Sequence, residues 1–114
     1  MAEFQKKENF AIIKIGKTEY KVEPVAGNRM ICEYNDKTPE FLEKIDEAKY
    51  DAKEVTKFMD FLVGIIDTVL GDKACQNIFN GQCSYYDLVD LYVYIRDEVR
   101  AFNQSKIKEY ATEV

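Results

Sequence analysis

The stretch that decides the fold is VTKFMDFLVGIIDTVLG, residues 55–71. Its apolar side chains return every three or four positions, the spacing of one face of an α-helix. That face carries Val55, Phe58, Met59, Leu62, Ile65, Ile66 and Val69. Phe61, Val63 and Leu70 widen the apolar arc to about 200°, where a surface helix needs little more than about 100°. The sequence therefore predicts a central helix that packs against more than one neighbour and ends at Gly71.

Upstream of this helix the apolar residues alternate with polar ones, the period of two that is typical of strands. Two strands are predicted over residues 10–15 and 18–23, joined by a two-residue turn in which Gly16 takes a positive φ. Pro24 ends the second strand because proline has no N–H to continue the ladder. The sequence leaves open whether residues 30–34 add a third strand.

At Thr38 the period changes to that of a helix. Thr38 is a favourable N-cap residue, and Pro39 fits the first helical position, where its missing N–H costs nothing. The sequence leaves open whether residues 39–70 form one helix or two joined near Tyr50.

Two further helices are predicted downstream of Gly71. Asp72 is the expected cap of a short helix that runs through Phe79. Ser84 is the expected cap of a final helix from Tyr85 to about residue 102.

These patterns predict a single α+β domain over residues 1–114. A small N-terminal antiparallel sheet of two or three strands lies within residues 10–35, and a mainly helical part with three or four helices lies within residues 39–102. Residues 1–9 and 104–114 are polar and expected to be loosely ordered. The predicted core consists of Val55, Phe58, Leu62, Ile65, Ile66, Leu88, Tyr92 and Ile95.

The final helix carries a second apolar stripe beside its main one. The main stripe comprises Tyr85, Leu88, Tyr92, Ile95, Val99 and Phe102. The second comprises Tyr86, Val89 and Val93, and Met59 and Val63 form a comparable shoulder on the central helix. Either other parts of the chain cover both shoulders, or a second chain does. We favour the second chain, because contiguous apolar surface seldom stays exposed without a partner. The predicted protein interface is therefore Met59, Val63, Tyr86, Val89 and Val93.

Several kinds of catalytic and metal site are excluded by residue types. The chain has no histidine, so no imidazole base or zinc-binding imidazole is available. Its three cysteines form no C-x-x-C pair, and we expect them to be free thiols, although Cys75 and Cys83 flank a turn that could bring them close. The helical carboxylates are predicted to lie on solvated faces: Asp60, Asp67, Asp87, Asp90 and Asp97. We expect no catalytic residue, no cofactor and no metal.

The charge pattern bears on partners. The net charge is −5, and no basic cluster of the kind that binds nucleic acid is present. The tyrosines of the final helix would need a basic groove to stack on bases, so core packing or protein contact is preferred for them. No run of 18 apolar residues occurs and the first seven residues have no apolar segment, so we expect neither a membrane span nor a secretory signal.

A family resemblance rests on three segments: KFMDFL at 57–62, IIDTVLG at 65–71 and NIFNG at 77–81. An aromatic and acidic helix runs into a leucine-glycine stop, then a short helix, then an Ile-Phe-x-Gly break before a final helix. With a preceding hairpin, this order resembles the short tail-assembly-chaperone-like proteins of tailed bacteriophages and prophages, over roughly residues 10–103. These motifs are hydrophobic and turn residues, and none is a catalytic signature.

The resemblance implies a role, partners and a location. Such proteins bind the long, aggregation-prone tape-measure protein before the tail tube polymerises around it. They often self-associate, they act in the cytoplasm of the bacterial host, and they are absent from the mature virion. For this chain it implies two partners, the tape-measure protein and another copy of itself, which would compete for an overlapping surface.

Other classes of protein remain as alternatives. A phage-encoded acidic inhibitor could imitate DNA, but Lys44, Lys49, Lys53 and Lys57 interrupt the acidic surface that this would need. A minor structural tail protein would be found in purified particles. A small enzyme is disfavoured by the missing histidine and the lack of a converging polar set.

Overall fold

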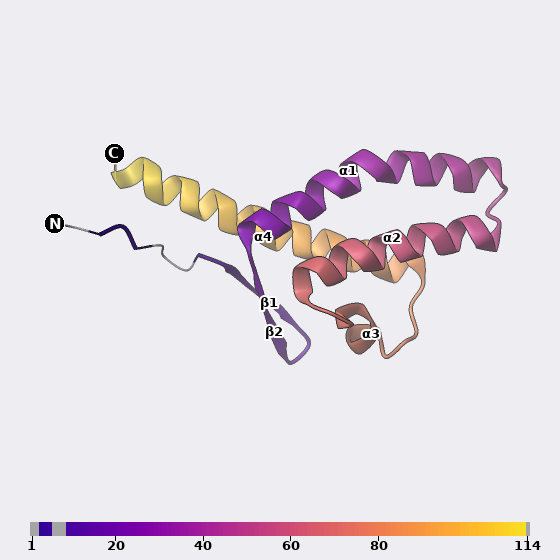
Figure 1. The fold of residues 1–114 in the computed structure, drawn as a ribbon, viewed down its shortest axis with the longest axis horizontal. Coiled ribbons are helices and arrows are strands. Elements are labelled where there is room, and N and C mark those ends of the chain that lie inside the picture. The colour runs from indigo at the N-terminus through magenta and orange to yellow at the C-terminus, as the bar shows by residue number, and fades with distance from the viewer. Residues whose placement is uncertain (1–2, 6–8, 114) are drawn as a thin grey trace.

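The computed structural model describes residues 3–5 and 9–113, and the fold is an α+β arrangement of a hairpin and four helices (Figure 1). Strands β1 (Ala11–Ile15) and β2 (Thr18–Val22) pair antiparallel with Ile15 opposite Thr18. Gly16 has φ 62°, which confirms the predicted two-residue turn. Of the nine N-terminal residues expected to be loose, 1–2 and 6–8 lie outside the described part of the chain, and 3–5 and 9 have no regular secondary structure.

The sequence left open a third strand over residues 30–34, and the structure has none there. These residues lie inside helix α1 (Pro24–Glu47), where Pro24 occupies the first turn and so ends β2 and begins the helix. The predicted helix start at Thr38 is also wrong, because α1 begins 14 residues earlier, at Pro24. Thr38 is buried within α1, and the helix continues through Pro39, whose ring is exposed. Residues 30–34 are rich in β-formers, but they belong to a longer pattern with the period of a helix. That pattern consists of Gly27, Met30, Tyr34, Thr38, Phe41 and Ile45.

Residues 39–70 belong to two helices, which settles the alternative that the sequence left open. Helix α2 spans Ala52–Leu70, and the turn that separates it from α1 includes Lys49 and Tyr50 in the left-handed region, with φ 53° and 62°. Gly71 follows α2 with φ 124°, as predicted for a residue that terminates a helix.

The last two helices correct two predicted boundaries. Helix α3 spans Ala74–Phe79 with Lys73 at its N-cap, so the cap predicted at Asp72 is wrong. Helix α4 begins at Tyr85 and is capped as predicted: the Asp87 N–H donates to Ser84 Oγ at 3.3 Å, and the Ser84 N–H donates to Asp87 Oδ2 at 2.9 Å. It runs to Glu113, so the predicted loose tail is helical in its described residues.

The three long helices α1, α2 and α4 pack together, and the hairpin lies against α4 (Figure 1). The Tyr94 hydroxyl of α4 donates to the Lys14 carbonyl of β1 at 2.6 Å. Every predicted core residue is buried except Val55, which is half-buried. The core also contains residues that were not predicted, among them Ile13, Val22, Met30, Ile45, Val69, Cys75, Leu91 and Val99. In the described part of the chain, none of the helices combines the length and the hydropathy that crossing a membrane requires.

Gly27 is the point where three elements meet. A Cβ atom at Gly27 would lie 2.9 Å from Val99 Cγ2 of α4 and 3.5 Å from Val22 Cγ1 of β2. The absence of a side chain on Gly27 therefore sets how closely α1 approaches α4. One residue further along α1, the Asn103 amide donates to Asn28 Oδ1 at 2.9 Å and marks the last α1–α4 hydrogen bond before α4 leaves the bundle.

Candidate protein-interaction surfaces

The five predicted interface residues differ in exposure. Met59 and Val63 of α2, and Val89 and Val93 of α4, are half-buried and pack against the chain's own core. Tyr86 is 63% exposed. The structure therefore does not gather them into one open apolar patch, and Tyr86 is the member that offers most of its side chain to a partner.

Tyr86 belongs to a group of three tyrosines, Tyr50, Tyr85 and Tyr86, which we name the tyrosine cluster. The Tyr85 and Tyr86 ring centroids are 4.1 Å apart, and Tyr85 in turn lies 6.3 Å from the ring of buried Phe58. A hydrogen bond with Tyr86 and, to a smaller degree, desolvation raise the pKa of the Tyr85 hydroxyl, and the charges of Tyr86 and Tyr50 raise it a little further. Tyr50 of the α1–α2 turn thus lies near the first turn of α4, which carries Tyr85 and Tyr86.

The backbone that carries Tyr50 is strained. Lys49 and Tyr50 are successive non-glycine residues in the left-handed region, which costs about 1–2 kcal/mol for each. The Tyr50 N–H donates to the Ile45 carbonyl at 2.8 Å, which holds the turn closed. The result is a tyrosine side chain that is 66% exposed and near enough to Tyr85 to affect its hydroxyl. Strained backbone conformations of this kind cluster at binding and catalytic sites.

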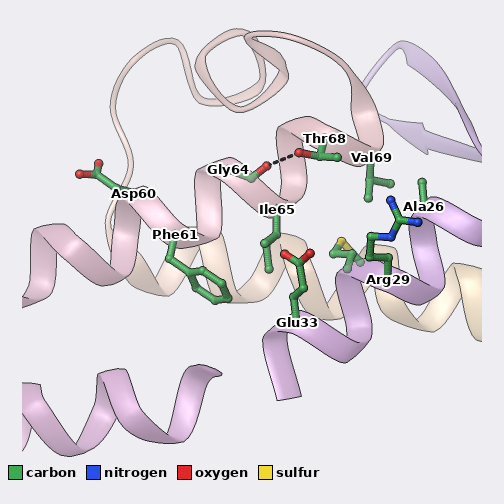
Figure 2. A pocket seen from close by; sticks show the side chains of 10 residues that line it. Ala26, Arg29, Glu33, Asp60, Phe61, Gly64, Ile65, Thr68 and Val69 are labelled. Atoms are coloured by element: carbon green, nitrogen blue, oxygen red, sulfur yellow. Dashed lines mark hydrogen bonds between the residues drawn. The ribbon is translucent and has the colours of Figure 1, made fainter. Parts of the chain in front are cut away.

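A second surface is the groove between α1 and α2, with a volume of about 310 Å³ (Figure 2). Its apolar lining comes from Met30 of α1 and from Phe61, Ile65 and Val69 of α2. Gly64 also lines it, and a Cβ atom there would meet nothing within 4 Å. A glycine inside a helix often marks a close approach by another backbone, but no described part of this chain makes one at Gly64, and the missing side chain leaves the groove open.

Charged side chains of α1 border this groove. Arg29 and Glu33 extend from α1 towards α2, whereas Asp60 of α2 points away from the gap (Figure 2). Within the described residues neither Arg29 nor Glu33 has an ion-pair partner. The groove therefore presents an apolar floor beside one cationic and one anionic group that are free to bind.

The third surface lies on the end of α4, which the sequence predicted to be loose. Ile107 is 68% exposed and Tyr110 is 55% exposed. At a spacing of three positions they share one face of the helix. The sequence holds a signal for Tyr110, which follows Phe102 of the main α4 stripe by eight positions, but not for Ile107, which follows it by five and lies off that stripe.

One of the helical aspartates contacts a cysteine in the described part of the chain. Asp60, Asp87, Asp90 and Asp97 are exposed, but the solvated position predicted for Asp67 is wrong, because Asp67 is half-buried and accepts a hydrogen bond from the Cys75 N–H at 2.9 Å. Burial, with a smaller effect of Asp67, raises the pKa of the Cys75 thiol to about 12. Cys75 and Cys83 are not bonded to each other. In the described ranges no three acidic or cysteine side chains gather in a way that could hold a metal ion.

Comparison with known proteins gives no family to which this chain can be assigned. No family model, curated protein or solved structure matches it. The three surfaces described above are therefore the observations from which a function is argued.

Proposed function

We propose that this protein is a non-catalytic tail-assembly chaperone of a tailed bacteriophage or prophage, which binds the tape-measure protein before the tail tube polymerises. The sequence order around residues 57–81 supports the family, and the tyrosine cluster supports the mode of action. Its location is then the cytoplasm of the bacterial host, and it would be absent from the finished virion.

The observation that carries this proposal is the exposure of Tyr50 and Tyr86 at one end of the bundle, at 66% and 63%. Tyrosine supplies a large apolar contact area and a polar hydroxyl at a low cost in side-chain entropy, and it is enriched among the residues that dominate protein interfaces. The Tyr86 ring rests on Tyr85 and, through it, on buried Phe58, so a partner meets a tyrosine that is already ordered.

Such a surface fits one face of an amphipathic helix, the form expected of a tape-measure segment. Val89 follows Tyr86 by three positions on α4, and Val93 follows Val89 by four, so the two half-buried valines extend the cluster along the helix. The net charge of −5 would keep a complex with an apolar partner in solution.

The acidic-inhibitor alternative is less well supported. DNA imitation needs acidic groups that are free to act as phosphates. In α1 and α2, Lys44 pairs with Glu40 at 3.2 Å and Lys57 pairs with Glu54 at 3.1 Å, which neutralises part of that surface. A minor structural tail protein would differ from a chaperone in being present in purified particles.

The test is co-expression with the tape-measure protein encoded near this gene, if the neighbouring genes include a tail-tube gene and a very long tape-measure gene. We expect the tape-measure protein to be soluble with the wild-type chain and insoluble with Tyr86→Glu. Ile12→Glu is the matched control, because it places the same charge on a comparably exposed apolar residue of the hairpin, at 57%, away from the surfaces described above. Equal solubilisation by wild type and Tyr86→Glu, with both folded by circular dichroism, would refute the proposal.

A further inference from the structure

The end of the bundle that carries the tyrosine cluster is acidic. Around the α1–α2 turn and in the first two turns of α4, several exposed charged side chains have no ion-pair partner within the described residues. Two of them are lysines, Lys49 and Lys53. The others are carboxylates, which we name the acidic rim: Asp46, Glu47, Asp51, Asp87 and Asp90. Carboxylates therefore outnumber cations around the tyrosines.

This acidity is local and does not simply reflect the net charge of −5. The hairpin carries three lysines, Lys14, Lys17 and Lys21, against one carboxylate, Glu19. Figure 1 shows the hairpin well away from the α1–α2 turn. The two regions are therefore opposite in charge, and a partner that docks on the tyrosine cluster meets the negative one.

Two carboxylates of the acidic rim are next to the exposed tyrosines and are not engaged elsewhere in the described chain. Asp90 follows Tyr86 by four positions, so it lies one turn further along the same face of α4. Asp51 follows Tyr50 directly and occupies the N-cap of α2, yet its side chain makes no capping hydrogen bond. Both carboxylates are thus available to a partner that contacts the tyrosines.

The exposed rings favour the same sign of charge in a partner. The face of a tyrosine ring carries partial negative charge and attracts a lysine or arginine placed over it. The chain uses this attraction elsewhere, where Lys21 Nζ lies 4.8 Å from the centre of the Phe10 ring. Within the described residues no cation lies over the rings of Tyr50 and Tyr86. Ring faces and carboxylates therefore both select a cationic partner.

We propose that the segment bound by the tyrosine cluster is an amphipathic helix with lysine or arginine beside its apolar face. Its apolar side chains contact Tyr86, Val89 and Val93, and its cations pair with Asp51 and Asp90. A second copy docked symmetrically on this surface would place carboxylates against carboxylates, which opposes binding. The inference rests on the proposed function in taking the tyrosine cluster as the binding surface, and it adds the charge of the partner.

The test uses two synthetic helical peptides that share one apolar stripe and differ only in whether lysine or glutamate flanks it. Fluorescence anisotropy measures the binding of each peptide to the full-length protein. At low salt we expect the lysine peptide to bind about tenfold more tightly than the glutamate peptide. The difference should shrink at high salt, because salt screens exposed charges. Equal affinities at low salt, or no binding of either peptide, would overturn the proposal.

Charge variants locate the preference on the protein. Asp90→Lys should weaken binding of the lysine peptide about fivefold and strengthen binding of the glutamate peptide. Asp51→Asn should weaken the lysine peptide about twofold, and asparagine keeps a favourable N-cap for α2. Asp87 is left unchanged because it takes part in the cap of α4.

Glu109→Lys is the matched control for Asp90→Lys. It makes the same change in net charge at an exposed residue 19 positions further along α4, about 28 Å away at 1.5 Å per residue. The far-ultraviolet spectrum of each variant should match that of the wild type. If Glu109→Lys weakens the lysine peptide as much as Asp90→Lys does, the preference comes from net charge alone and the proposal is overturned.

The outcomes separate this inference from the proposed function. If both peptides bind equally and Tyr86→Ala releases both, the cluster binds helices without a preference for charge. The inference then fails and the proposed function stands. If the lysine peptide is preferred as expected but the tape-measure protein stays insoluble on co-expression, the inference stands and the proposed function fails.

Discussion

The same substitution at two helical glycines should have opposite effects on stability. Alanine is favoured over glycine within a helix by about 0.5–1 kcal/mol, because glycine loses more backbone entropy on folding. At Gly64 nothing lies within 4 Å of a new Cβ atom, so we expect Gly64→Ala to stabilise the protein by about that amount.

At Gly27 the new methyl group would meet both γ carbons of Val99, at 2.9 Å and 3.0 Å. Valine is stiff about χ1 and Val99 is only 1% exposed, so the side chain has little room to move. Overpacking of this kind costs about 1–3 kcal/mol. Set against the gain in helix propensity, Gly27→Ala should destabilise the protein by roughly 0–2.5 kcal/mol.

Chemical denaturation of the two variants and of Gly27→Ala/Val99→Ala measures these effects. The double variant should show a favourable coupling energy, because shortening Val99 removes the clash that the new methyl group creates. The close packing of α1 on α4 would be refuted if Gly27→Ala stabilised the protein as much as Gly64→Ala, or if the two changes at Gly27 and Val99 were simply additive.

Three further predictions concern the core and its polar groups. Leu62→Ala, at a fully buried position, should cost about 2–5 kcal/mol and lower the melting temperature markedly; an unchanged melt would contradict its place in the core. Tyr94→Phe should destabilise the protein by about 0.5–1.5 kcal/mol, because it removes the hydrogen bond to the Lys14 carbonyl. Tyr92→Phe should be neutral or stabilising, because the buried Tyr92 hydroxyl has no partner among the described residues. Equal effects of the two substitutions in urea titrations would refute this. Folding raises the pKa of the Cys75 thiol from 9.0 to about 12, so the unfolded chain loses this proton at a lower pH than the folded protein does. The free energy of unfolding should therefore fall between pH 9 and 12, by up to about 1.4 kcal/mol per pH unit. Cys75→Ala should show a smaller fall over that window.

The sequence by itself determined the elements whose signals are local. The alternation over residues 18–22 and the need for a positive φ at Gly16 specified the hairpin. The apolar period of α2 and the stop at Gly71 specified the central helix, and the Ser84–Asp87 cap specified where α4 begins. These features depend on residues a few positions apart, so periodicity and capping rules suffice to predict them.

Elsewhere, packing against distant parts of the chain or continuation of an existing helix overrode local propensity. Residues 30–34 contain β-formers, yet they are helical because Gly27, Met30 and Tyr34 place one continuous face of α1 against the core. The polar residues after Phe102 are helical because extending an existing helix is far less costly than nucleating a new one.

The candidate surfaces were decided by the tertiary structure. Tyr86 could be predicted as an exposed apolar residue. Tyr50, however, is 35 positions before Tyr85 and comes near it only through the left-handed turn between α1 and α2. The groove over Gly64 exists because α1 leaves it uncovered, which no local pattern specifies. Amphipathic periodicity tells which face of a helix is apolar, whereas the path of every other helix determines how much of that face remains open to a partner.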